Sequence, residues 1–179
     1  DEGGEQGGEG GGGAPTSYAL ASTDSNAFQY DAKPQIESYA DLVGASYQAA
    51  VSAAQALDQA VDELLAAPSE DTLNAARQAW VKARQPYLQT EVFRFYDGPI
   101  EEIEGRINAW SMNEAAIDYV KDDPKAGLIN SDKDLTPEAI IGANQADDEA
   151  NVTTGWHAIE FLLWGQDFSA EGPGARPAL

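Results

Sequence analysis

The only histidine of this chain, His157, stands three residues before a carboxylate, Glu160. On a helix, residues three apart lie on one face, about one turn from each other. The residues around them, 155–167, are mostly apolar, which is typical of a buried helix. A neutral imidazole and a carboxylate suit iron, zinc or manganese, so the pair predicts two metal ligands. A metal site takes three or four ligands, so the pair alone does not complete one.

The same pair has a simpler interpretation. A buried imidazole and a buried carboxyl group are costly without partners, so His157 and Glu160 can satisfy each other as a purely structural contact. The spacing is not the His-Glu-x-x-His of zinc peptidases, in which two histidines bind zinc and the glutamate activates water. By the residues alone, metal ligation and a structural pair both stay open.

A second set of ionisable residues lies on a helix predicted over 70–96. Arg84, Tyr87, Glu91 and Arg94 recur at steps of three and four residues, which gives this helix a polar stripe. Glu91 and Arg94 can pair on the surface, or the stripe can turn Glu91 toward the interior, where it would join the metal ligands.

A third stretch, 105–110, begins with a glycine that Arg106 follows directly, and it ends at Trp110. An arginine beside an aromatic side chain can line a pocket and bind a carboxylate with two parallel hydrogen bonds. The alternative is an exposed Arg106 at the start of a helix predicted over 107–119.

The elements that must position these groups are helices. Apolar residues at helical spacing predict a long helix from Pro34 to about Ala67 and a second over 70–96. Thr136 and Pro137 favour the start of a short helix, and Thr154 and Gly165 can bound the helix of the His157 pair. No strand pattern of useful length is present, so the sequence predicts an all-α, up-and-down bundle over residues 31–179.

The composition excludes some partners. The 179 residues carry a formal net charge of −21 and no cysteine. Nucleic acids and anionic membrane surfaces are held by lysine and arginine, so neither is an expected partner. Disulfides, thiolate catalysis and iron–sulfur clusters need cysteine, so the sequence excludes all three within this chain.

The first residues are dominated by glycine and acids, so we expect 1–30 to be a disordered tether. The chain starts at Asp1 and not at methionine, from which we expect a processed product. Such a spacer fits a tether between a membrane anchor and a folded domain, which would be the chain's only link to a membrane.

Several blocks, in order, resemble the imelysin family, also called peptidase family M75, whose signature is Gly-x-His-x-x-Glu. The signature falls on Gly155, His157 and Glu160, and the resemblance spans roughly residues 35–177. The other matching blocks are 91–95, 97–100, 104–110, 161–167 and 172–177.

The resemblance implies an exported bacterial protein, periplasmic or anchored at the outer membrane, with two helical bundle halves and a link to iron uptake. His157 and Glu160 take the place of the family's metal or catalytic pair, with iron favoured over zinc. Glu91, Arg94 and the 104–110 block that holds Arg106 and Trp110 match family blocks.

A full family member continues for about as long again, so we expect this chain to be an N-terminal half. Its expected partners are the C-terminal half of the same protein and components of iron uptake. Three functions follow: an iron-binding module, a metallopeptidase in which His157 and Glu160 are catalytic, or a partner-binding domain with a structural His–Glu pair.

Overall fold

The computed structural model describes residues 31–94, 98–168 and 172–178. The predicted tether at 1–30 lies outside these residues. The chain divides into two units, Asp1–Glu37 and Ser38–Leu179. The described part of the first unit is the start of a helix, with an exposed ion pair between Lys33 and Glu37. All further features belong to the second unit.

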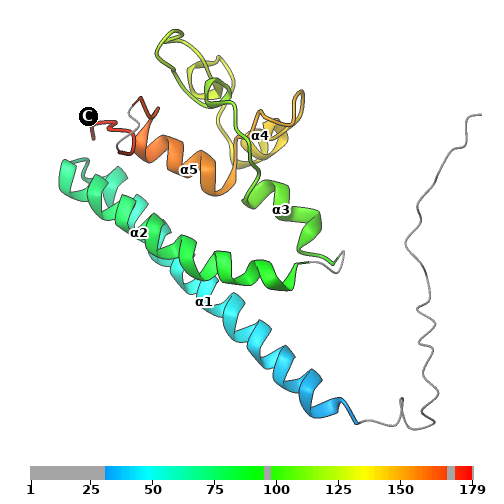
Figure 1. Cartoon of the computed structure of the whole chain (residues 1–179). Coiled ribbons are helices and arrows are strands. Elements are labelled where there is room, and N and C mark those ends of the chain that lie inside the picture. Colours follow the sequence, from blue (N-terminus) through cyan, green and yellow to red (C-terminus); the bar gives the residue numbers. More distant parts are fainter. Residues whose placement is uncertain (1–30, 95–97, 169–171, 179) are drawn as a thin grey trace, which may run out of the picture. The chain divides into compact units, whose positions relative to one another are not determined.

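The all-α prediction is confirmed (Figure 1). In the described ranges the only β-type pairing is an isolated bridge between Val120 and Asp123. None of the described helices combines the length and apolar content of a bilayer span. The elements are α1 (Lys33–Ala66), α2 (Glu70–Gln89), η1 (Thr90–Phe93), α3 (Glu101–Ile107), η2 (Glu114–Ala116), η3 (Leu128–Asn130), α4 (Pro137–Ala143) and α5 (Gly155–Trp164).

Local sequence explains most helix ends. Ser69 caps α2 by accepting a hydrogen bond from the Thr72 amide, and the Thr72 hydroxyl accepts one from the Ser69 amide. Thr136 caps α4 by a single bond, since its hydroxyl accepts from the Ala139 amide, and proline lies in the first turn. Gly165 ends α5 at φ +71°, a conformation that favours glycine. The predicted bounds of α5 are therefore confirmed.

The main core lies where α1, α2 and α5 meet. Leu57 of α1 packs with four buried residues of α2 and with Trp156 and Leu163 of α5. Trp80 is the centre of this core, because its ring contacts Trp156 and Trp164 edge-on, and its indole N–H donates to the Trp156 carbonyl at 3.0 Å. This packing fixes α5 against α2, and the two helices lie side by side in Figure 1.

The helix predicted over 107–119 is wrong. The helix in this region is α3, which ends at Ile107, and the following residues are irregular apart from η2. Three glutamates in the first turn and an arginine in the last suit the dipole of this short helix. The apolar residues after it serve different partners, since Trp110 covers His157 while Ile117 packs on Ala158 and Phe161 of α5.

Candidate functional site

The first residue of α5 explains the glycine of the Gly-x-His-x-x-Glu signature. Gly155 has φ +85°, and a Cβ at this position would lie 2.3 Å from the carbonyl oxygen of Ile107. Only glycine allows this close approach to the end of α3. Thr154, predicted as a cap, makes no capping bond; its hydroxyl instead donates to the Arg106 carbonyl at 2.8 Å. The start of α5 is thus fixed against α3.

The far end of α5 is held by two arginines. The Arg77 guanidinium donates two hydrogen bonds to the Leu163 carbonyl, at 3.0 and 2.8 Å, and one to the Arg176 carbonyl at 2.6 Å. The Arg176 amide donates to Trp164, and its side chain pairs with the buried Asp118 at 2.8 Å. The carbonyls of the last two residues of α5, Leu163 and Trp164, therefore have partners.

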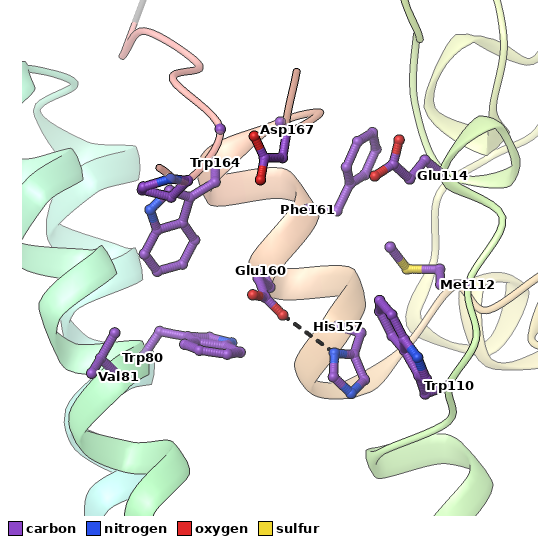
Figure 2. Close-up of a pocket in the computed structure, with 13 residues that line it drawn as sticks. Trp80, Val81, Trp110, Met112, Glu114, His157, Glu160, Phe161, Trp164 and Asp167 are labelled. Carbon is purple, nitrogen blue, oxygen red and sulfur yellow. Dashed lines mark hydrogen bonds and ion pairs between the residues drawn. The ribbon is translucent and has the colours of Figure 1, made fainter. Parts of the chain in front are cut away.

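His157 and Glu160 contact each other, as their spacing predicts. The distance from Nδ1 of His157 to Oε2 of Glu160 is 3.2 Å (Figure 2). The two side chains differ in exposure, because the imidazole is 15% exposed and the Glu160 side chain 43%. The carboxylate is therefore the more accessible member of the pair.

The other faces of the imidazole are also covered. Nη2 of Arg84 lies 3.5 Å from Nε2 of His157. The Trp110 ring lies against the imidazole, with the ring centroids 4.6 Å apart (Figure 2). Arg84 is itself held by the Asn108 side-chain oxygen and by the faces of Tyr87 and Trp156. His157 thus lies between a cation, a carboxylate and an indole.

The pair borders a pocket of about 450 Å³ between α2, α5 and the segment after α3 (Figure 2). Aromatic side chains form much of its wall, and three carboxylates reach it. The lining residues are Trp80, Val81, Trp110, Met112, Glu114, His157, Glu160, Phe161, Trp164, Gly165, Asp167, Pro173 and Gly174. An apolar pocket with a few convergent polar groups is the usual form of a ligand site.

The pocket does not hold a complete metal site of its own. Within the described residues, no three His, Cys, Asp or Glu side chains are grouped so that they could bind one ion. The nearby Glu114 accepts a hydrogen bond from the Gln166 amide at 2.7 Å. His157 and Glu160 therefore supply at most two donors, and a metal would need further ligands from elsewhere.

Glu91 and Arg94 belong to a second pocket, of about 490 Å³, which Glu101 and Glu104 complete. Arg94 is 7% exposed and donates to Glu104 at 2.6 Å, whereas Glu91 is 68% exposed and lies 3.8 Å from Arg94. Burial alone would lower the pKa of Arg94, but Tyr87 and Glu104 outweigh it and raise this pKa. The second pocket is thus centred on a buried, paired guanidinium.

Tyr87 and Arg84 lie between the two pockets. The Tyr87 hydroxyl accepts a hydrogen bond from Arg94 at 3.1 Å, and the Tyr87 ring packs against Trp156 and Arg84. Burial raises the pKa of Tyr87 and lowers the pKa of Arg84. Both side chains are therefore parts of the packed interior that joins the pockets.

The structure groups the predicted residues only in part. Trp110 joins His157 and Glu160 at the first pocket. Glu91 and Arg94 lie at the second, so Glu91 is not brought to the His157 pair. Tyr87 connects the two, and Arg106 is exposed at the end of α3, outside both linings.

Two residues that matter at these pockets were not predicted as site residues. Arg84 was placed on the polar stripe of the second helix, but its contact with His157 spans 73 residues. Glu104, the partner of Arg94, belongs to a run of glutamates that is typical of the solvent-exposed start of a helix. The only sequence signal for either is its helical spacing from other charged residues.

The sequence model of the family described as imelysin matches residues 43–178, which include both pockets. The chain is also similar to iron-regulated protein A of Synechococcus elongatus, with 29% identity over 130 residues, 72% of this chain and 31% of that protein. The chain thus spans about a third of the length of this curated relative. With the family match extending over most of its length, the chain belongs to the imelysin family.

Proposed function

We propose that this chain is part of an exported, iron-associated protein of the imelysin family that binds a cation at its first pocket. The observation that carries the proposal is the half-exposed carboxylate of Glu160, which borders a pocket of about 450 Å³ and is held by His157. Iron is the first candidate because the similar protein of Synechococcus elongatus is named iron-regulated protein A. Carboxylates such as that of Glu160 are ligands in iron sites of proteins.

The remaining ligands would come from outside the described residues. The chain spans about a third of its curated relative, so a longer protein can supply them from its C-terminal part. The predicted links to iron-uptake components and to the periplasm or outer membrane belong to the same proposal. The net charge of −21 would favour the approach of a cation over that of an anion.

The experiment is an anaerobic calorimetric titration of the full-length protein and of this chain with Fe²⁺ alone. Glu160→Gln removes the charge at constant shape. We expect it to weaken Fe²⁺ binding by at least about tenfold, because even the loss of an outer-shell partner weakens metal binding by about 10–100-fold. Glu102→Gln, at an exposed acid of α3, is the matched control and should bind as the wild type does. Saturable binding that is equal in the Glu160→Gln variant would overturn the proposal.

The alternative is a structural His157–Glu160 pair in a domain that binds a partner protein. It is supported by the mutual contact of 3.2 Å, which satisfies both side chains without a ligand. This alternative predicts that His157→Ala lowers the melting temperature and leaves Fe²⁺ affinity unchanged. A thermal melt beside the titration separates the two functions.

A further inference from the structure

The partners of His157 determine which of its nitrogens carries the proton. A guanidinium has five N–H donors and no acceptor. Nε2 of His157, which faces Nη2 of Arg84 at 3.5 Å, can therefore only accept from it. Nδ1 faces the Glu160 carboxylate at 3.2 Å and can donate to it. Both contacts are satisfied together only by the neutral imidazole with its proton on Nδ1.

This arrangement leaves no imidazole nitrogen free to bind a cation. A metal at Nε2 would occupy the position of the Arg84 guanidinium, and the two positive charges would repel each other. Arg84 is not a loose side chain, since Asn108 binds one of its nitrogens and Tyr87 and Trp156 pack on its faces. Moving it aside would break these contacts.

Glu160, in contrast to His157, is accessible to a ligand in the first pocket. Its side chain is 43% exposed and borders the first pocket, whereas the imidazole is 15% exposed and also has Trp110 against its ring. One carboxylate oxygen can keep the Nδ1–H hydrogen bond while the other contacts a ligand, because an ionised carboxylate has about four acceptor positions.

We infer that Glu160 is the ligand-contacting member of the pair and that His157, held by Arg84, is a positioning residue that orients the Glu160 carboxylate. The ligand class is the cation of the proposed function, on which this part of the inference rests. The tautomer of His157 and the role of Arg84 do not depend on any ligand.

The tautomer is tested first, on the ligand-free chain. His157 is the only histidine, so a long-range proton–nitrogen correlation spectrum contains one imidazole. We expect the neutral ring to carry its proton on Nδ1 and none on Nε2. In Arg84→Met, which keeps the length but removes the donors, the Nε2–H form should become populated. Arg106→Met, at an exposed arginine, is the control and should leave the spectrum unchanged.

Substitutions of His157 then separate positioning from ligation. Asparagine places an amide N–H close to the position of Nδ1–H, so His157→Asn can still orient Glu160. We expect His157→Asn to bind Fe²⁺ within about threefold of the wild type and His157→Ala to lose about tenfold or more, the usual cost of an outer-shell partner. If Nε2 were a direct ligand, both variants would lose binding equally.

Two results would overturn the inference: a wild-type imidazole with its proton on Nε2, or equal losses in His157→Asn and His157→Ala. An unchanged tautomer in Arg84→Met would show that Arg84 does not position His157. If the wild type binds no Fe²⁺, the proposed function fails, and the tautomer spectra still decide whether Arg84 positions His157.

Discussion

Gly155 packs so closely on Ile107 that an added Cβ would lie 2.3 Å from the Ile107 carbonyl oxygen, so no side chain fits here between α5 and the end of α3. This contact sets where α5 begins and hence where His157 and Glu160 lie. The glycine of the signature is therefore a packing requirement of the site.

Gly155→Ala should destabilise the chain by at least about 3 kcal/mol, because it combines a positive φ with a backbone clash. The measurement is urea unfolding followed by far-UV circular dichroism. Gly44→Ala is the matched control, since Gly44 lies inside α1 with no atom within 4 Å of the added Cβ. That change should stabilise by about 0.5–1 kcal/mol. Equal stabilities for the two variants would contradict the packing role of Gly155.

Arg77→Met should cost about 2–3 kcal/mol of unfolding free energy, because it leaves the Leu163 carbonyl of α5 and the Arg176 carbonyl of the C-terminal segment without their charged donor. Arg106→Met, on the exposed end of α3, should change stability by less than about 0.5 kcal/mol. Thermal melts of both variants test this. A cost for Arg77→Met no larger than that of the control would mean that solvent replaces the arginine.

The two glutamates beside Arg94, Glu104 and Glu91, should differ in how much they stabilise the fold. Glu104→Gln leaves a nearly buried guanidinium without the negative charge of its close partner and should cost about 2 kcal/mol, below the ~3–5 kcal/mol of a fully buried pair, since Glu104 is 30% exposed. Glu91→Gln, at an exposed and distant partner, should cost less than about 1 kcal/mol. Urea denaturation measures both. The prediction fails if Glu91→Gln is the more harmful change.

Tyr87 should make the fold sensitive to alkaline pH. Its pKa is raised in the folded state by burial, so the unfolded chain loses this proton first as the pH rises. The contribution of Tyr87 to the free energy of unfolding is fully present below about pH 10, the ordinary tyrosine pKa. It is lost as the pH rises through the pKa of Tyr87 in the folded state.

Tyr87→Phe removes this titration, so unfolding free energy plotted against pH should fall less steeply above about pH 10 than in the wild type. At neutral pH the variant should be less stable by about 1 kcal/mol, because the Arg94 hydrogen bond to the hydroxyl is lost. Tyr119→Phe, at a half-exposed tyrosine, is the control. Parallel pH curves for wild type and Tyr87→Phe would refute the prediction.

What the sequence predicted was local, and what it missed depends on contacts between distant segments. The His157–Glu160 contact follows from helical spacing alone. The contact between Arg84 and His157 needs α2 and α5 side by side, which no local pattern encodes. The irregular course after Ile107 was missed for the same reason, since Trp110 and Ile117 each pack on α5.

All four tryptophans of the chain gather around one helix. Trp156 and Trp164 are part of α5, Trp80 packs edge-on against both, and Trp110 covers the imidazole of His157. Three of the four, Trp80, Trp110 and Trp164, line the first pocket, so the intrinsic fluorescence of the protein arises mainly from its walls. A quenching ion or an added aromatic ligand that enters this pocket would change that emission directly, so its binding can be followed in unlabelled protein.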